Sequence, residues 1–337
     1  MTTTITRRAV IATVAALLAG VAPFKNVYLG TRLAYAGDTW PAKPVTIVVS
    51  FVPGGATDLV GRLLAMELGK TFNQSFVVAN RPGAAGQVGT EYVASQPKDG
   101  YTLLISATGH VMAPSIQSKV NYHPVNDFEP VALLITMPNL LVVNPDIPPK
   151  TISEFLAWGK TQPSIPFGSA GAGGATHLSG ELLRHVSGLP LSHVAYKGNG
   201  PSMVDTMGGQ IPAAFVDTVS VGSYVTSGKL RALAVTSDKR SALYPDVPTI
   251  TEAGFNDYDL ENWVGLYAPA GTPKDVVVKL NAAVTKIMKS PEVLAKMRDL
   301  GADSSNGLNA DQFRQYVVDE GEKWRKTIEV TGVKISN

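Results

Sequence analysis

The chain of 337 residues contains no cysteine, which excludes disulfide bonds, a thiolate nucleophile and zinc held by cysteine. Its 29 basic and 27 acidic side chains give a formal net charge of +2 without any long run of one sign, which argues against nucleic acid as a partner. The hydrophobic share of 45% is enough for a large buried core, and at this length two domains are expected.

The N-terminal segment has the pattern of an export signal. Arg7 and Arg8 precede an apolar stretch over residues 9–22, and Ala34-Tyr35-Ala36 forms a small-residue cleavage site. The apolar stretch is shorter than the roughly 20 residues that span a membrane. We therefore predict that residues 1–36 are a signal peptide cleaved after Ala36, and that the mature protein is soluble and periplasmic. An uncleaved anchor is the alternative, and the arginine pair leaves the general and twin-arginine export routes both open.

The rest of the chain alternates short apolar runs with helical patterns, which is typical of an α/β fold. The first series predicts strands at 45–51, 75–80 and 101–106, and helices at 58–70 and 83–95. Residues 128–143 contain two apolar runs broken at Pro138, and we expect them to form a strand that crosses between two lobes.

A second α/β series follows this crossing strand. It predicts strands at 165–169, 191–196, 211–216 and 229–236, and helices at 176–187 and 201–207. Residues 262–267 are expected to return to the first lobe, which helices at 275–289 and 310–330 complete. The prediction is thus two lobes, each a mostly parallel sheet flanked by helices, with lobe 1 at 37–137 plus 262–337 and lobe 2 at 138–261. Two hinge crossings would let the lobes close on a ligand.

Two glycine-rich turns, at residues 51–58 and 168–177, each lead from a predicted strand into a predicted helix. The start of a helix has free backbone N–H groups and the positive end of the helix dipole, which together bind anions. Glycines such as Gly54 and Gly55 can adopt left-handed dihedrals and allow close approach of a ligand. Because residues 53–58 include no Lys or Arg, we expect N–H groups rather than a cation to hold the anion.

Several segments together resemble the Bug-type periplasmic solute receptors, which are the extracytoplasmic binding proteins of tripartite tricarboxylate transporters (the TctC family). They are Trp-Pro-Ala-Lys-Pro-Val at 40–45, Phe-Val-Pro-Gly-Gly-Ala-Thr-Asp at 51–58, Asn-Arg-Pro-Gly-Ala-Ala-Gly at 80–86, Ala-Tyr-Lys-Gly-Asn-Gly-Pro at 195–201 and Ala-Pro-Ala-Gly-Thr-Pro at 268–273. The resemblance implies a type II-like Venus-flytrap fold, in which backbone groups and bridging waters hold a small carboxylate in a cleft between the lobes. It also implies delivery of that ligand to a membrane permease.

The resemblance further implies which segments contact the ligand: the two glycine turns, the loop at 83–89, the region of Thr108 and the strand end at 215–217. The predicted ligand-binding residues are Phe51, Gly54, Gly55, Ala56, Thr57, Asp58, Ala85, Gly86, Gln87, Thr108, Ser169, Ala170, Gly171, Thr176, His177, Lys197 and Asp217. The chain departs from the family where Phe215-Val216-Asp217 replaces the usual Phe-Asp pair, and where Gln87 stands in a position at which Asn is common.

Most of these side chains also have a structural interpretation. Asp58 is placed to cap the helix after the first turn, and Ser169 and Thr176 to stabilise the second turn. His177 could be a structural histidine, while Lys197 could either neutralise a distal carboxylate or lie in solvent. For these five positions the sequence leaves both interpretations open.

Motifs for catalysis and metal binding are missing from the sequence. The five histidines lack the spacing of metal ligands, and neither a G-x-S-x-G nor a nucleotide-binding glycine pattern occurs. We therefore predict a monomeric receptor, without cofactor or metal, for an aliphatic or aromatic carboxylate, with a dicarboxylate favoured because two anion-binding turns face one cleft. The alternatives are an exported sensor that signals to a histidine kinase, and an exported hydrolase that uses Ser169 with His177.

Overall fold

The computed structural model describes residues 40–117, 119–256, 258–305 and 307–333. The predicted export signal lies outside these residues. In the part of the chain that is described, no helix is both long and apolar enough to cross a membrane.

Three parallel strands form one end of the sheet, in the order β2 (Phe76–Asn80), β1 (Val45–Val49) and β3 (Thr102–Ala107). The segments that follow these strands supply helix α2 (Ala56–Phe72), the short turn η1 (Ala84–Gly86) with helix α3 (Gln87–Ala94), and helix α4 (Gly109–Ile116). The side chains of β1 are almost all buried, as expected for a parallel strand covered on both faces.

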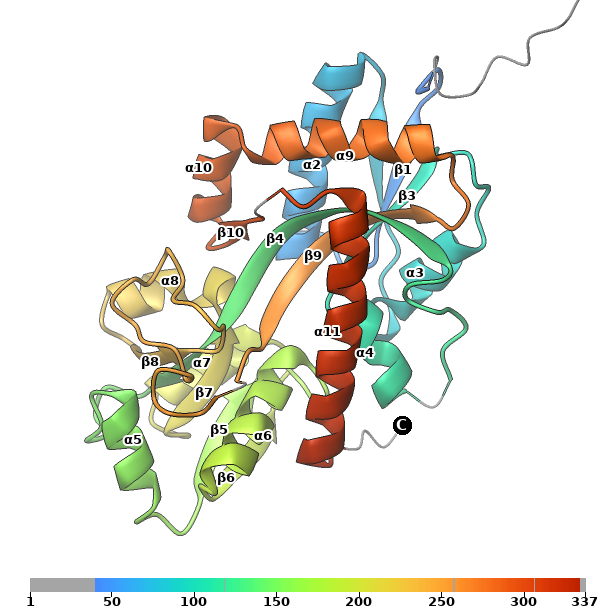
Figure 1. The fold of residues 1–337 in the computed structure, drawn as a ribbon. Coiled ribbons are helices and arrows are strands. Elements are labelled where there is room, and N and C mark those ends of the chain that lie inside the picture. The colour runs from blue at the N-terminus through green and yellow to red at the C-terminus, as the bar shows by residue number, and fades with distance from the viewer. Residues whose placement is uncertain (1–39, 118, 257, 306, 334–337) are drawn as a thin grey trace, which may run out of the picture.

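Two long antiparallel strands, β4 (Phe128–Val143) and β9 (Glu261–Pro269), run through the middle of the molecule (Figure 1). β9 also pairs with β3, and the two-residue strand β10 (Asp303–Ser304) pairs with β4. β4 continues through Pro138 without a break, since Pro138 lies opposite Glu261 in the ladder. The predicted strand therefore has the expected bounds and is continuous.

The other end of the sheet contains the second series of elements. From Asn139 onward, β4 pairs with β7 (Ala213–Asp217) and β8 (Arg231–Val235), while β5 (Ile165–Ser169) lies parallel to both β6 (Leu191–Ala195) and β7. Four helices belong to this part: α5 (Ile152–Gly159), α6 (Ala175–Ser187), α7 (Asn199–Met207) and α8 (Thr218–Thr226). The proposed lobe boundaries fall at the point where β4 stops pairing with β9 and begins to pair with β7 and β8.

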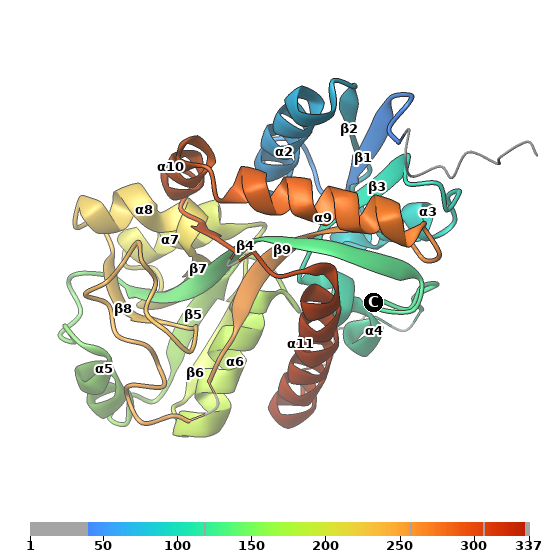
Figure 2. The same cartoon turned by 45° about the horizontal axis from the view of Figure 1, so that its top comes forward.

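Three helices follow β9. α9 (Lys274–Met288) packs on α2 and β4, and α10 (Pro291–Asp299) packs on α9. The last helix, α11 (Ala310–Thr331), contacts α4, β4 and α6, so it lies against elements of both series (Figures 1 and 2). One cluster of buried apolar side chains contains residues of both series, such as Val48 and Phe167, together with Phe313 and Trp324 of α11.

The sheet is mixed, whereas the sequence predicted mostly parallel sheets. The parallel pairs lie at its two ends, and the antiparallel pairs formed by β4 and β9 join them. Helices α4, α5, α8 and α10 were not predicted. α4 contains Pro114 and has only eight residues, and α8 begins with Thr218 and Val219, which are β-branched residues of low helix propensity.

Candidate functional site

A cavity of about 650 Å³ lies between the two glycine turns and helix α4. Its lining combines residues of the first series, such as Phe51 and Thr57, with residues of the second series, such as Gly171 and Asp217. Nine of the predicted ligand-binding residues line it: Phe51, Ala56, Thr57, Ala85, Thr108, Ala170, Gly171, Thr176 and Asp217.

The first turn brings the N-terminus of α2 to the cavity. The helix begins at Ala56 with Gly55 as its N-cap, and no side chain caps it. The first backbone N–H groups of a helix have no partner within it, so those of Ala56 and Thr57 remain available to a ligand. The predicted start at Asp58 was wrong by two residues, and Asp58 belongs to the first turn of the helix instead of capping it.

Asp58 organises this turn without lining the cavity. Its side chain is 2% exposed, and Oδ2 accepts hydrogen bonds from the backbone N–H of Gly54 and from Nε of Arg62, each at 2.9 Å. Oδ1 accepts a third from Nδ2 of Asn80 at 2.8 Å. Burial acts to raise the pKa of Asp58, but the hydrogen bonds from Arg62, Gly54 and Asn80 outweigh it and hold that pKa below its usual value.

The left-handed glycine of the first turn is Gly54, with φ of +86°. Gly55 has φ of −80°, a value that any residue can adopt, so the expectation of left-handed dihedrals holds for only one of the pair. Neither residue lines the cavity by its own atoms.

The second turn repeats this arrangement between β5 and α6. Gly174 is the N-cap of α6, again without a side-chain cap. Gly171 and Gly173 have φ of +147° and +75°, so the backbone turns sharply between the strand and the helix. The hydroxyl of Thr176 accepts a hydrogen bond from the N–H of Ala170 at 3.0 Å and ties the two sides of the turn together.

Two uncapped helix N-termini, those of α2 and α6, therefore open on the same cavity. None of the lining residues is Lys, Arg or His, and Asp217 is the only one with an ionisable side chain. The positive potential that these two helix N-termini contribute therefore comes from backbone dipoles.

Much of the cavity wall outside the two turns is apolar, although Thr108, Gln117 and Asn262 also line it. Phe51, Met112, Ile116 and Met137 contribute large side chains, and several alanines fill the space among them. Asp217 also lines the cavity; its Oδ1 accepts from the N–H of Ser220 at 2.8 Å, and its Oδ2 accepts from Nδ2 of Asn199 at 2.5 Å. This carboxylate is thus engaged as the N-cap of α8.

The loop at 83–89 reaches the cavity through a strained backbone. Ala84 and Ala85 have φ of +46° and +53°, which is unusual for residues with a Cβ, and both line the cavity. A Cβ at Gly109 would lie 2.7 Å from the carbonyl oxygen of Ala85, so glycine is needed for α4 to approach this loop.

Eight predicted ligand-binding residues are not part of the lining: Gly54, Gly55, Asp58, Gly86, Gln87, Ser169, His177 and Lys197. Gly86 packs under Phe51 and Ser50, where a Cβ would lie 3.1 Å from Oγ of Ser50. Gln87 donates to Glu91 and to the carbonyl of Lys119, and Lys197 is exposed. For these residues ligand contact remains a proposal.

Ser169 and His177 do not form the dyad considered in the hydrolase alternative. Oγ of Ser169 lies 2.6 Å from Nε2 of His193, while Nδ1 of His177 accepts from the N–H of Gly173 at 2.9 Å. Ser169 is fully buried. The contact between Ser169 and His193 joins β5 to β6. It could not be predicted from the sequence, because the two residues are distant in the chain.

The lining also includes residues that the sequence analysis missed. The largest group comes from α4, namely Gly109, Met112, Ala113 and Ile116, followed by Gln117. α4 follows β3 in the same strand–turn–helix order as the two glycine turns, so the order of elements was a usable signal. Met137 of β4 and Asn262 of β9 come from the central strands, and only their pairing in space brings them to the cavity.

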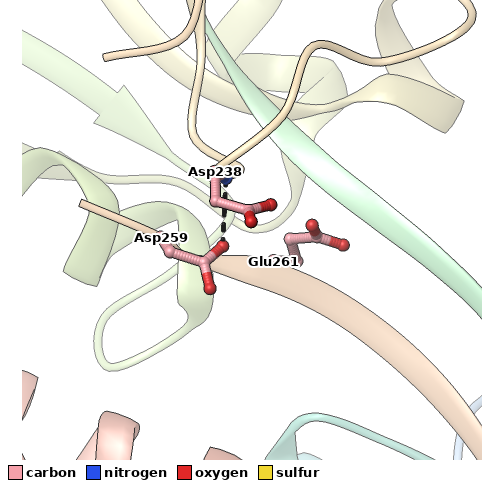
Figure 3. Close-up of side chains that lie close together, drawn as sticks. All are labelled: Asp238, Asp259 and Glu261. Carbon is pink, nitrogen blue, oxygen red and sulfur yellow. Dashed lines mark hydrogen bonds between the residues drawn. The ribbon is translucent and has the colours of Figure 1, made fainter. Parts of the chain in front are cut away.

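A separate group of acidic side chains, Asp238, Asp259 and Glu261, lies near the start of β9 (Figure 3). Their oxygen atoms are within 4.8 Å of one another, the one group of metal-compatible spacing among the described residues. The N–H of Asp238 donates to Oδ1 of Asp259 at 3.2 Å, and Nζ of Lys323 lies 2.7 Å from Oδ2 of Asp259. Burial, with repulsion from Asp259, raises the pKa of Glu261 to about 7. The ammonium of Lys323 and the proton that Glu261 retains thus already reduce the negative charge of this group.

Known proteins are similar to this chain over most of its length. Residues 60–333 match the model of the tripartite tricarboxylate transporter family receptor. The chain is 34% identical to protein BugT of Bordetella pertussis over 91% of this chain and 94% of that protein. It is 36% identical to a protein encoded in the tcbD-tcbE intergenic region of Pseudomonas sp. strain P51, over 86% of this chain and 87% of that protein.

Solved structures extend the similarity to the fold. The periplasmic binding protein BugD matches with a TM-score of 0.74 and 35% identity, over 88% of this chain and 99% of that one. R. palustris Rpa4515 with adipate matches with a TM-score of 0.77 and 33% identity, over 88% of this chain and 99% of that one. MatC from Rhodopseudomonas palustris with bound malate matches with a TM-score of 0.72 and 34% identity, over 86% of this chain and 100% of that one. The predicted α/β fold of periplasmic binding proteins is confirmed.

Proposed function

The chain belongs to the family of tripartite tricarboxylate transporter receptors, and from this premise we propose that it captures a small carboxylate in the periplasm and delivers it to a membrane permease. The proposal includes binding as a monomer, in the cavity between the two glycine turns. It assigns no catalytic role, since Ser169 is buried and outside the cavity lining.

The observation that carries the proposal is the pair of uncapped helix N-termini at one cavity. Each offers unpaired N–H groups, which favour a carboxylate oxygen as the acceptor. One carboxylate would bind at Ala56 and Thr57, and a second at the turn before α6. A dicarboxylate that spans the cavity therefore satisfies both ends, and similar proteins have been solved with adipate and with malate.

The wall between the two ends favours a ligand with an apolar middle. Met112, Ile116 and Met137 offer hydrocarbon surface rather than hydrogen-bonding groups. Burial of each ligand methylene against such a surface contributes about 0.8 kcal/mol. A hydroxyl placed against these three side chains, away from Thr108, Gln117 and Asn262, would lose its bonds to water without replacement. We therefore propose a straight aliphatic or an aromatic spacer between the carboxylates.

Thermal unfolding of the mature protein with a panel of aliphatic and aromatic mono- and dicarboxylates tests the function. A ligand at 100 times its dissociation constant should stabilise the protein by about 2.7 kcal/mol. Dicarboxylates such as adipate are expected to raise the melting temperature, and matched diols without charge are not. If no carboxylate stabilises the protein, the proposed function is wrong.

In the same experiment, Gly174→Leu serves as a variant whose added side chain should block the cavity and prevent ligand binding. Gly174 lines the cavity with φ of −77°, and a Cβ there meets nothing closer than 3.6 Å, so the fold can accept a side chain that fills the ligand space. Gly208→Leu, at φ of −78° outside the lining, is the matched control. Stabilisation by the dicarboxylate should disappear in the first variant and persist in the second.

A further inference from the structure

Asn262 is a polar side chain in the cavity wall that is held from behind by a buried partner. It is the second residue of β9, is half-buried and lines the cavity. Met137 lies opposite it in the ladder of β4 and β9, and residues that face each other in an antiparallel pair lie on the same face of the sheet. Nδ2 of Asn262 donates to Oδ1 of Asn139 at 2.9 Å. Asn139 is fully buried and does not line the cavity.

Three linked hydrogen bonds determine which end of the Asn262 amide faces Asn139. The carbonyl of Ala175 can only accept, so Oγ of Ser179, at 2.8 Å, donates its single hydrogen to it. Towards Asn139 this Oγ therefore acts as an acceptor, and Nδ2 of Asn139 donates to it at 3.1 Å. Oδ1 of Asn139 is then the atom that meets Asn262, and it can only accept. The nitrogen of Asn262 must face Asn139, which directs the oxygen elsewhere.

Oδ1 of Asn262 is thus an acceptor that remains for the ligand. No group in the described part of the chain donates to this atom, although Nδ2 of the same amide is engaged. A carbonyl that loses water when a ligand enters needs a new donor, because an unpaired buried acceptor is costly. A carboxylate cannot supply that donor, since its oxygens are acceptors themselves. A hydroxyl can.

The two other polar side chains outside the glycine turns are less suited to this role. Oγ1 of Thr108 is buried and accepts from the N–H of Trp263 at 2.9 Å, so it is already engaged with β9. Gln117 donates to the carbonyl of Ala84 at 3.3 Å, and within the described ranges no buried side chain fixes its amide. Asn262 is therefore the one of these three whose free acceptor has a defined direction.

We propose that Asn262 is a specificity-determining residue, whose amide oxygen selects a dicarboxylate with one hydroxyl on its aliphatic spacer. This inference rests on the proposed function, which assigns the two carboxylates to the N-termini of α2 and α6. An ammonium group on the spacer could also donate, but the positive potential of those two N-termini disfavours a cation. The rest of the spacer stays apolar, against side chains such as Met112 and Ile116.

Calorimetric titration of the wild-type protein with succinate, malate and 2-fluorosuccinate tests the inference. The three ligands share one carbon chain, and at about pH 8 all are fully ionised. Fluorine is similar in size to a hydroxyl but cannot donate a hydrogen bond. Malate should bind about tenfold more tightly than the other two, which leave Oδ1 of Asn262 without a donor. Adipate, 3-hydroxyadipate and 3-fluoroadipate repeat the comparison with a longer spacer. If the hydroxylated ligand is not preferred at either length, the inference is wrong.

Variants assign the preference to this residue. Asn262→Leu removes the acceptor at similar size, so the preference for the hydroxylated ligand over the fluorinated one should disappear. The double variant Asn139→Leu/Asn262→Leu should behave in the same way, and it avoids leaving Oδ1 of Asn139 buried without a partner. Asn126→Leu, at an exposed asparagine outside the lining, should keep the preference. Circular dichroism without ligand identifies the variants that fold. A preference that persists in a folded Asn262 variant would overturn the inference.

Failure of this inference can be distinguished from failure of the proposed function. If the dicarboxylates bind the wild-type protein with equal affinities whether or not they carry a hydroxyl, the proposed function stands and the role of Asn262 is refuted. If none of them binds, the proposed function fails, and the inference fails with it.

Discussion

Nε of Arg62 donates a hydrogen bond to Oδ2 of Asp58 at 2.9 Å. The cation closest in sequence to the first glycine turn therefore neutralises a carboxylate of the protein itself and does not line the cavity. Asp58 in turn holds the N–H of Gly54, so Arg62 supports the turn indirectly. The anion-binding end of the cavity is left to the backbone of α2.

Asp58→Ala should destabilise the protein more than Arg62→Gln. The first change leaves the N–H of Gly54, the guanidinium and the amide of Asn80 without their common acceptor, which should cost about 1–3 kcal/mol. The second leaves Asp58 with two of its three donors and removes a side chain that is 52% exposed, so about 1 kcal/mol or less is expected. Urea unfolding gives both values. Loss of ligand binding in Arg62→Gln alone, with the fold intact, would indicate a site built around a cation.

Gly54→Ala and Gly55→Ala should differ although the residues are adjacent. At φ of +86° a side chain is strained, and the first change should cost about 1–2 kcal/mol and weaken ligand binding. At φ of −80°, with no atom closer than 3.9 Å to an added Cβ, the second should leave the stability almost unchanged. Thermal unfolding with and without adipate measures both effects. Equal losses would mean that the turn adopts a different conformation.

Met112→Ser should lower the affinity for adipate more than the affinity for malate. It replaces part of the apolar cavity wall by a hydroxyl, and the loss of apolar contact should cost about 1–2 kcal/mol, or roughly tenfold in affinity. Malate is shorter and carries its own hydroxyl. Met66→Ser, at a methionine that is 46% exposed on α2, is the control and should change neither affinity. Calorimetric titration of both ligands would show the difference.

Salt should affect ligand affinity only weakly. The cavity lining contains no lysine or arginine, so short-range hydrogen bonds to N–H groups replace ion pairs that salt would screen. Between about 50 and 500 mM sodium chloride, the dissociation constant should rise less than about threefold. A tenfold rise would show that a cation outside the lining moves to the ligand.

Glu261→Gln should stabilise the protein at alkaline pH. With a pKa of about 7, native Glu261 holds a proton that the unfolded chain releases above about pH 4.5, so the free energy of unfolding falls as the pH rises between these values. The variant should gain about 1–3 kcal/mol near pH 8 and nothing near pH 4. Glu292→Gln, at an exposed carboxylate whose pKa is lowered by its hydrogen bond to Lys296, should show no gain. Equal gains at both pH values would exclude titration of Glu261 as the cause.

The sequence predicted best what depends on local pattern. The run from Phe128 to Val143 is apolar enough to define its strand, and the two glycine turns give the helix N-termini within a few residues. What it could not predict arises from contacts between distant segments. Met137 reaches the cavity through strand pairing, and Ser169 takes His193 as its partner because β5 lies beside β6. Helix α4 was missed for a local reason, since Pro114 interrupts its pattern.

The pairing of β4 with β9 also determines when this protein can fold. β4 ends at Val143 and its neighbour begins at Glu261, so the whole second series must be synthesised before the central ladder can form. α11, which packs on β4, arrives later still. Contacts between segments so distant in the chain form slowly, because a long loop must close before they can stabilise anything. The native sheet of this protein can therefore be completed only late in synthesis, after β9 has been made.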